Sequence, residues 1–256
     1  MLSDLPPRTE LVLRVAAEPQ EAAHYEALRR DTLAQAERAL NGEAPGQAHL
    51  NILAGLTRLR RAACDPRLVS PGIAWSGAKV RAFADLAAEL VANGHKALVF
   101  SQFVDFLALL REPLDAAGIA YQYLDGSTPA AERTRRVEAF QRGEGELFLI
   151  SLKAGGFGLN LTQADYVVIA DPWWNPAVED QATDRAHRIG QQRPVTVYRL
   201  VREGTLEDRI LSLHQGKREL ADAVLDGSDV RAAPAPEELL ALMRGDEALG
   251  TLYDES

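Results

Sequence analysis

Cysteines, clustered histidines and long apolar runs are scarce in this sequence of 256 residues. Cys64 is the only cysteine, so no disulfide can form within the chain, and such usage is typical of a reducing compartment. The five histidines fall at no spacing that suits a metal site, and we predict no structural metal. The longest apolar runs, such as 97–100 and 166–170, have the length of strands and are too short to cross a membrane.

A secretory signal and an excess of positive charge are also missing. The first residues lack a basic segment followed by an apolar core and a cleavage site, so we expect a cytoplasmic protein without membrane contact. The formal net charge of -9 argues against a uniformly basic surface that coats nucleic acid. A local basic track remains compatible with this charge, because phosphate contacts need only a few well-placed donors. The 46% of apolar residues is typical of a folded domain.

The first part of the sequence, residues 1–70, has the pattern of helices. Apolar residues recur over 18–40 at the spacing of one helix face, with charged residues between them. A second helix is expected over 49–63, and it ends before Pro66, because a proline disfavours helical conformation in the residue that precedes it. A long helix is also expected near the end of the sequence, over 206–226, followed by an Ala/Pro linker and a short helix over 237–244.

Between these helical parts, from residue 79 to 201, short β-rich runs alternate with helical stretches. Buried apolar strands that alternate with helices predict a parallel sheet with helices on both faces. Pro113 falls inside one expected helix and is predicted to kink or split it. The expected strands are 97–100, 120–124, 147–151, 166–170 and 195–201, and the expected helices are 104–117, 129–141 and 176–188.

Unusual residues follow two of the expected strands, at the edge where parallel α/β sheets bind ligands. Three glycines within 155–158 come after strand 147–151, with Lys153 beside them. Such a loop lets a ligand backbone approach closely, although a tight structural turn explains it equally well. Trp173 and Trp174 follow strand 166–170 in a proline-bounded loop. An exposed indole there would stack on a base or sugar, and burial of both rings is the alternative.

A further candidate ligand site is formed by Gln181, Arg185 and Arg188, whose spacing would place them on one face of a helix. Two guanidinium groups and an amide on one face form a clamp for phosphate oxygens, since arginine donors suit two-point contacts. The alternative is a solvated face on which Asp184 pairs with Arg188, a contact worth about 0.3–0.5 kcal/mol. Taken without its context, this spacing favours the solvated face.

The context of this spacing is a set of six segments, whose order and content resemble motifs of one family. They are Leu5–Glu10, Leu59–Pro66, Ala97–Phe103, Leu124–Thr128 with Arg133 and Phe140, Ser151–Thr162, and Gln181–Gln191. Together they resemble the second RecA-like lobe of superfamily 2 helicases, and specifically of Swi/Snf-type remodelling ATPases. Chance matches to one motif are common, whereas six in order are not. The Trp-Asn-Pro at 174–176 and the Arg-Ala-His-Arg-Ile-Gly-Gln at 185–191 separate this family from ordinary unwinding helicases.

This resemblance implies a fold and a division of the chain. The fold is of the α/β class: a RecA-like parallel sheet with helices on both faces, an N-terminal helical protrusion and a C-terminal brace helix. The implied parts are a protrusion and lead-in over 1–70, the helicase C-terminal lobe over 71–204, and the brace helix with a tail over 205–256.

The resemblance also implies roles for individual residues. Arg185 and Arg188 would be catalytic arginine fingers that reach the γ-phosphate of ATP. His187 would orient its neighbours. On the ATP side, Gln181 would align the nucleotide, and Gly156, Gly158 and Asn160 would shape the loop beside it. The DNA-binding residues would be Ser101, Gln102, Gly126, Ser127, Lys153, Thr162 and Trp174.

A phosphate-binding P-loop is absent from the sequence. No G-x-x-x-x-G-K-[ST] occurs, and Gly216-Lys217 is followed by Arg218. We therefore expect ATP and Mg²⁺ to be bound mainly by an N-terminal RecA-like lobe, in the same or a separate chain, and the 256 residues alone to hydrolyse no ATP. The other expected partners are double-stranded DNA and protein–DNA complexes as remodelling targets, and the expected location is the cytoplasm, in association with the nucleoid.

Two other functions remain open from the sequence. One is the C-terminal lobe of a strand-unwinding DNA or RNA helicase. The other is a non-catalytic module that binds DNA or protein. Loss of Gln181, Arg185 or Arg188 would have favoured the second of these, and all three are present.

Overall fold

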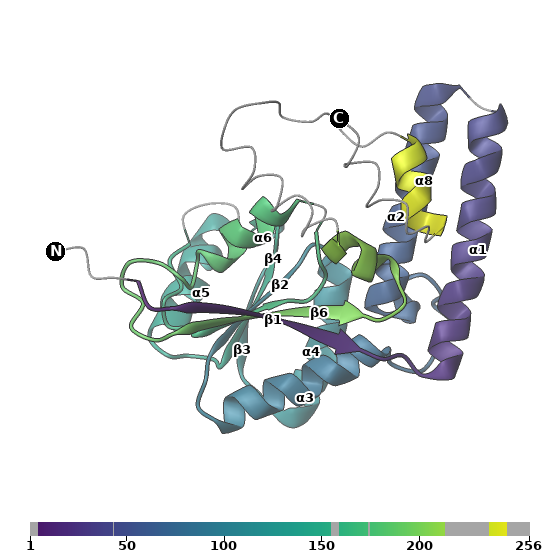
Figure 1. Cartoon of the computed structure of the whole chain (residues 1–256). Coiled ribbons are helices and arrows are strands. Elements are labelled where there is room, and N and C mark those ends of the chain that lie inside the picture. The colour runs from purple at the N-terminus through teal and green to yellow at the C-terminus, as the bar shows by residue number, and fades with distance from the viewer. Residues whose placement is uncertain (1–4, 43, 155–158, 174, 213–235, 245–256) are drawn as a thin grey trace, which may run out of the picture. The chain divides into compact units, whose positions relative to one another are not determined.

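The computed structural model describes residues 5–42, 44–154, 159–173, 175–212 and 236–244 (Figure 1). The chain divides into two compact units. The first, which we call the sheet unit, is formed by 1–16 and 76–201, and the second, the helical unit, by 17–75 and 202–256. The helix expected over 206–226 is described only as far as residue 212, where it is helical, and its remainder lies outside the described residues.

The sheet unit is built on one six-stranded parallel sheet. Its central strands are paired in register, with Val99 between Leu149 and Val168. Every residue of β2 and of β4 is buried, as expected for strands covered on both faces. The predicted parallel α/β sheet is therefore confirmed. In the order of the sheet, the strands are β1 (Arg8–Val15), β6 (Val195–Arg202), β5 (Tyr166–Ile169), β2 (Ala97–Ser101), β4 (Leu147–Ser151) and β3 (Tyr121–Leu124).

One edge strand, β1, corrects the sequence interpretation. The prediction that 1–70 is helical is wrong for Arg8–Val15, which forms a strand beside β6. The segment has β-branched residues at Thr9, Val12 and Val15, which fit a strand, but most of its residues are exposed. Its pairing partner lies far along the chain, since Val195 N donates to the carbonyl of Pro7 at 3.0 Å. A local pattern carries no information about such a partner.

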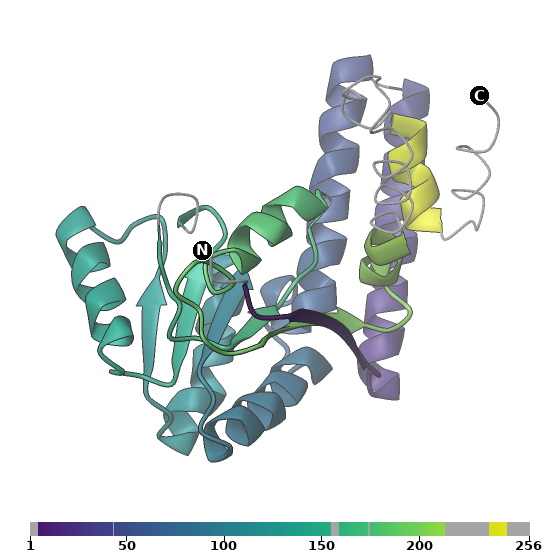
Figure 2. The ribbon, with the colours of Figure 1, turned by 60° about the vertical axis from the view of Figure 1, so that its left-hand side comes forward.

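Four helices cover the two faces of the sheet. Right-handed connections between parallel strands place α3 (Ala78–Ala92) and α4 (Val104–Ala117) on one face. They place α5 (Ala130–Gln141) and α6 (Pro176–Thr183) on the other, and Figures 1 and 2 show this arrangement. Helix α3 was not expected from the sequence. Pro113 does not split α4, which runs without a break to Gly118, whose φ of 65° ends it in the left-handed conformation.

A buried apolar cluster fills the space between the sheet and the helices α5 and α6. Alternate residues of the central strands, such as Leu98 and Phe100, form this cluster with Phe140 of α5 and Ala182 of α6. The connection from β4 to β5, residues 152–165, contains no α-helix in its described part and packs into the same cluster. Its buried members are Ala154, Leu159, Leu161 and Ala164.

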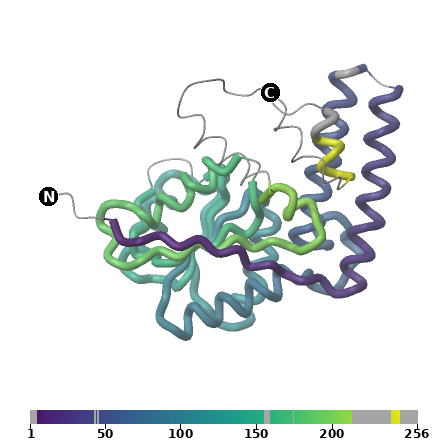
Figure 3. The backbone as a smooth tube through the Cα atoms, viewed as in Figure 1, coloured from purple at the N-terminus to yellow at the C-terminus, as the bar shows by residue number. Residues whose placement is uncertain are grey.

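The helical unit contains a pair of long helices, α1 (Pro19–Gly42) and α2 (Pro45–Cys64), drawn as a tube in Figure 3. The short helix α8 (Pro236–Arg244) packs against both of them. The two long helices approach closely at Gly55, where an added Cβ would lie 2.7 Å from the Thr32 side chain. Both predicted helices and the short terminal helix are thus present, with bounds that differ by a few residues.

Arg202 is the largest fully buried side chain of the helical unit, and it ties several segments together. Its guanidinium donates to the carbonyls of Ala62 at 3.1 Å and Glu21 at 2.9 Å. It also lies 5.0 Å from the centre of the Tyr25 ring, a cation–π distance. The Tyr25 hydroxyl in turn accepts from Leu206 N at 2.9 Å, at the start of the helical residues 206–212.

Tyr25 gives the helical unit a testable pH dependence. Burial raises the pKa of Tyr25 from 10.0 to about 12. The unfolded phenol ionises near pH 10, so the stabilisation is fully present below pH 10 and is lost as the pH rises from 10 to about 12. In unfolding experiments at increasing pH, the free energy of unfolding should therefore fall in this range by up to about 2–3 kcal/mol more than in Tyr25→Phe.

The same variant serves as the control at neutral pH. Tyr25→Phe leaves Leu206 N without its acceptor and should cost about 1 kcal/mol at pH 7. An equal loss of stability above pH 10 in the wild type and in Tyr25→Phe would show that this hydroxyl is not the responsible group.

Candidate functional site at the carboxyl edge of the sheet

The loops that leave the carboxyl ends of β2, β3 and β4 carry four of the predicted DNA-binding residues. Because the strands are parallel, Gln102, Gly126, Ser127 and Lys153 share this edge. Gly126, Ser127 and Lys153 are exposed, and Gln102 is half-buried. The predicted Gly156, Gly158 and Trp174 lie outside the described residues.

The turn after β2 places its two predicted residues differently. Ser101 is fully buried, and its hydroxyl bonds within the turn, accepting from Phe103 N at 3.0 Å. Gln102 N donates to the Asp171 carboxylate at 3.3 Å, which joins the ends of β2 and β5. The burial of Ser101 gives no support to its direct contact with DNA. Gln102 is half-buried, and its amide nitrogen Nε2 is buried without a hydrogen-bond partner among the described residues.

The turn after β3 is shaped by Asp125. This carboxylate accepts from Ser127 N at 2.8 Å and from the Ser127 hydroxyl at 2.6 Å. The hydrogen bonds from Ser127 lower the pKa of Asp125 below its ordinary value, which indicates a carboxylate held in its charged form. An added Cβ at Gly126 would meet no atom within 4 Å, so this backbone is open to a large ligand.

The β4–β5 connection is held at both sides of its glycines by helix α5. Arg133 donates to the carbonyl of Ala154 at 2.8 Å, before the glycines. Gln141 donates to the carbonyl of Asn160 at 2.9 Å and accepts from Gln163 N at 3.3 Å, after them. The predicted Asn160 is thus fixed through its backbone.

Helix α6 is shorter than predicted. It begins at Pro176, where the Asn175 side chain accepts from Ala177 N at 3.1 Å, and it ends at Thr183 rather than at Arg188. Residues 184–190, which we call the arginine turn, follow as a series of turns. Beyond Thr183 the regular helical bonding is lost, because Arg185 N and Ala186 N bond three residues back, to the carbonyls of Ala182 and Thr183. The carbonyl of Arg185 then accepts from Leu161 N of the β4–β5 connection at 3.0 Å, a tertiary bond. The expectation of one continuous helix face is therefore wrong.

The three residues of the predicted phosphate clamp nevertheless meet. Gln181, Arg185 and Arg188 line one open hollow of about 450 Å³. Arg188 is exposed, while Arg185 is only 8% exposed, and its Nε is buried with no hydrogen-bond partner among the described residues. The other lining residues are Leu5, Asp184, His187 and Ile189.

The solvated-face alternative predicts an ion pair between Asp184 and Arg188. In the structure Asp184 instead lies 3.8 Å from Arg8, and Arg188 has no ion pair among the described residues. A buried arginine Nε without a partner is uncommon in folded proteins, because this donor has lost its hydrogen bond to water. The arrangement around the hollow therefore favours a site for an anion over a solvated face.

The start of β1 is bonded to the arginine turn. His187 Nε2 lies 2.7 Å from the carbonyl of Pro6, and since a carbonyl only accepts, this nitrogen carries the proton. Arg8 donates to the carboxylate of Asp180 at 2.8 Å, on α6. His187 thus makes a contact that suits its expected orienting role.

Glu179 and Arg199 form a buried ion pair that the sequence interpretation missed. Glu179 is fully buried, and its carboxylate accepts from Arg199 Nε at 2.7 Å and from Trp173 N at 2.8 Å. Arg199 also donates to Glu10 of β1 at 2.7 Å. A charged residue within a strand expected to be buried was the signal available in the sequence. The pair therefore fixes the backbone at Trp173, which follows β5, to α6 and to the sheet.

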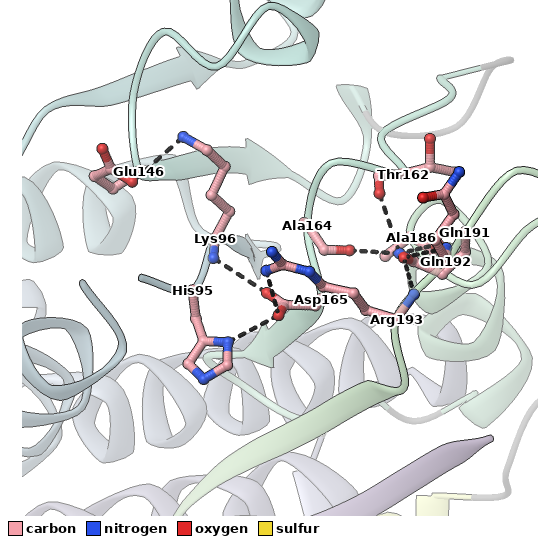
Figure 4. Close-up of polar contacts among 10 residues, drawn as sticks. All are labelled: His95, Lys96, Glu146, Thr162, Ala164, Asp165, Ala186, Gln191, Gln192 and Arg193. Atoms are coloured by element: carbon pink, nitrogen blue, oxygen red, sulfur yellow. Dashed lines mark hydrogen bonds and ion pairs between the residues drawn. The ribbon is translucent and has the colours of Figure 1, made fainter. Parts of the chain in front are cut away.

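A polar cluster fastens the opposite, amino-terminal edge of the sheet (Figure 4). Asp165, just before β5, is 3% exposed and accepts from Lys96 N at 3.1 Å, just before β2. His95 Nδ1 lies 2.8 Å from the other oxygen of this carboxylate, and Arg193 lies 3.3 Å from it. Among the described residues, no three His, Cys, Asp or Glu side chains form a group that suits a metal, and no helix there has the length and apolarity to span a bilayer.

Comparisons with known proteins agree with this geometry. Residues 78–190 match the helicase conserved C-terminal domain. The chromatin-remodeling ATPase INO80 of Cryptococcus neoformans is 42% identical over 173 residues, which are 67% of this chain and 10% of that protein. The structure of the Sulfolobus solfataricus SWI2/SNF2 ATPase core in complex with dsDNA has a TM-score of 0.72 at 30% identity, covering 88% of this chain and 47% of that one.

A further solved structure, the Sulfolobus solfataricus SWI2/SNF2 ATPase C-terminal domain, has a TM-score of 0.72 at 26% identity and covers 92% of this chain and 97% of that one. The chain therefore contains a helicase conserved C-terminal domain of superfamily 2. This domain is of the Swi/Snf type, as the six motifs indicated. The chain spans between 9% and 21% of the length of eight of the curated relatives that it matches.

The buried ion pair provides a test of how the edge is fixed. Glu179→Ala leaves the buried Arg199 with one of its two carboxylate partners and removes the acceptor of Trp173 N. We expect the free energy of unfolding to fall by about 3–5 kcal/mol in denaturant titrations. Glu144→Ala is the control, because its ion pair with Arg142 is 59% exposed on both sides and should contribute less than about 1 kcal/mol. Equal effects of the two substitutions would contradict the assigned role of Glu179.

Proposed function

We propose that this chain supplies the second motor lobe of a DNA-dependent ATPase, which translocates on duplex DNA and remodels protein–DNA complexes. The Swi/Snf-type domain supports the enzyme class, and the relatives include chromatin-remodelling ATPases. A solved relative is an ATPase core in complex with duplex DNA. The sequence lacks a P-loop, so ATP and Mg²⁺ are held mainly by an N-terminal RecA-like lobe, and the chain alone hydrolyses no ATP.

The hollow at the arginine turn is the observation that carries this proposal. The guanidinium of Arg185 has a buried Nε without a partner, beside the exposed Arg188 and the amide of Gln181. Planar guanidinium donors suit phosphate oxygens, because each can hold two oxygens at once. Within the described residues, this is the place where the predicted clamp comes together.

The chain's own residues act on the γ-phosphate from one side. ATP supplies the phosphoryl bond that is broken, and Mg²⁺ neutralises charge on its phosphates. Arg185 and Arg188 donate hydrogen bonds to the γ-phosphate oxygens as charge develops there, and the barrier falls because these donors are already in place. Gln181, in the last turn of α6, aligns the nucleotide beside them, and Asn160 with Gly156 and Gly158 shapes the loop that links nucleotide to DNA.

The exposed loops of the carboxyl edge form the proposed DNA track. Gln102, Gly126, Ser127 and Lys153 would meet phosphates of one strand, which positions the protein without reading sequence. We also include Thr162 and Trp174 among the DNA-binding residues of this proposed track. Most of the surplus of acidic residues lies outside the sheet unit, so the overall negative charge does not oppose this contact.

The arginine-finger assignment is tested in the complete enzyme, with the chain combined with its P-loop lobe. Arg185→Ala and Arg188→Ala should each lower DNA-stimulated turnover by about 10³-fold or more, with ATP binding largely kept. Turnover is measured as phosphate release, and binding with a fluorescent ATP analogue.

The control for these variants is Arg135→Ala, because Arg135 is exposed on α5 and pairs only with Glu132 among the described residues. This variant should turn over at the normal rate. Near-normal turnover in both Arg185→Ala and Arg188→Ala would remove the assignment.

The DNA track has its own test in the salt dependence of binding. Lys153→Ala should weaken binding of the chain to duplex DNA equally for different sequences, because Lys153 meets phosphate rather than bases. The slope of log K against log salt concentration should become shallower by about 1. Arg142→Ala is the control, since Arg142 is exposed at the end of α5 that faces away from the carboxyl edge. A slope unchanged by Lys153→Ala, as measured by fluorescence anisotropy, would exclude this lysine from the track.

A further inference from the structure

Gln191, the residue that follows the arginine turn, is bonded to two separate segments (Figure 4). Its side chain is buried, and Nε2 lies 3.1 Å from the carbonyl of Ala186 in the turn. The same nitrogen lies 3.2 Å from the carbonyl of Thr162 and 2.8 Å from that of Ala164, in the β4–β5 connection. One amide group therefore bridges the turn and the connection.

The side-chain oxygen of Gln191 is also bonded. This oxygen, Oε1, accepts from Gln192 N and from Arg193 N, at 2.9 Å each. Only an amide combines two N–H donors with a strong acceptor and no charge. A carboxylate at this position would keep the two accepted bonds but could not donate to the three carbonyls. The identity of this side chain is thus matched to its surroundings.

A second bond joins the same two segments directly. Leu161 N of the connection donates to the carbonyl of Arg185 at 3.0 Å. The peptide groups of Arg185 and Ala186 are therefore both bonded to the connection, one directly and one through Gln191. No hydrogen bond or ion pair of the Arg185 side chain to another described residue is present, so the position of its guanidinium depends on this backbone.

We infer that Gln191 is a positioning residue, which holds the backbone of the arginine turn against the β4–β5 connection so that the two move as one body. The inference rests on the proposed function and deepens it. The connection carries the glycines and Lys153 of the proposed DNA track, while the turn carries the arginines that face the nucleotide. Gln191 thereby links DNA contact to the placement of Arg185.

Helix α5 provides an internal comparison. Gln141 bonds to the connection at Asn160 and Gln163 but makes no described contact with the arginine turn. Loss of Gln141 should loosen the connection alone, whereas loss of Gln191 should loosen the connection and the turn together. The two glutamines therefore separate a general loosening of the loop from a loss of coupling.

The first measurement uses the full chain without ATP. Hydrogen–deuterium exchange should rise at Leu161 and over 185–188 in Gln191→Met, and at residues 160–163 only in Gln141→Met. Gln192→Met is the matched control, because Gln192 is the exposed neighbour and its side chain makes no described bond. Unchanged exchange over 185–188 in Gln191→Met would overturn the inference.

The second measurement uses the chain combined with its P-loop lobe, at a temperature where every variant is folded. Gln191→Met and Gln191→Glu should lower the DNA-stimulated kcat by about 10²-fold, since a small misplacement of a catalytic group has effects of this size. The KM for ATP should change less than about threefold, because the other lobe provides most of the binding. Gln192→Met should behave as the wild type. A merely structural role would lower the melting temperature and leave kcat of the folded enzyme intact.

The outcomes separate this inference from the proposed function. A lower kcat in both Gln191 variants, with Arg185→Ala inactive, supports the inference. A normal kcat in the Gln191 variants, with Arg185→Ala inactive, overturns the inference and leaves the proposed function standing. Normal turnover in Arg185→Ala removes the proposed function itself, and the inference with it.

Discussion

Buried peptide groups must find hydrogen-bond partners, and the β4–β5 connection is where this requirement is hardest to meet. The other connections within the sheet unit contain α-helices, which bond their own backbone, whereas the described part of this one contains no α-helix and is packed into the apolar cluster. Its peptide groups are bonded instead by Arg133 and Gln141 on one side and by the arginine turn on the other. A need of the backbone has thus brought the candidate functional segments into direct contact.

A second set of contacts fixes the same edge through charge. The pair of Glu179 with Arg199 places two ionised groups where water is excluded, which is tolerated because each charge has a close partner of opposite sign. Nη2 of Arg199 is buried without a hydrogen-bond partner among the described residues. Glu179 accepts from Trp173 N after β5, and Arg199 donates to Glu10 of the edge strand β1. The segment at Trp173 and the edge strand β1 are thus both bonded to this pair, and β1 is in turn bonded to the arginine turn through Pro6 and His187. A site built from several loops needs such support if its donors are to be in place before a ligand arrives.

The sequence was informative where local pattern and motif order decide the structure, as in the five parallel strands, the helices α1, α2, α4 and α5, and the domain family. It was not informative where contacts with residues far along the chain decide the local structure. The strand β1 depends on β6, and the arginine turn beyond α6 is bonded to the distant β4–β5 connection, from Leu161 N to the carbonyl of Arg185. The burial of Ser101 likewise follows from the packing of the whole sheet. The clamp residues were found through the family's motif, although the helix face assumed for them does not exist.

The position of β1 in the chain has a consequence for how the protein forms during synthesis. This strand precedes its neighbour β6, which begins at Val195, so this edge of the sheet stays open until the segment between the two strands has been synthesised. Pairing between segments so far apart is slow, because a long loop must close before any contact repays the lost entropy. Pro6 and Arg8, which bind the arginine turn and α6, arrive with this strand. The hollow at the arginine turn is accordingly among the last parts of the sheet unit to take shape, and a truncated chain that stops before β6 cannot assemble it.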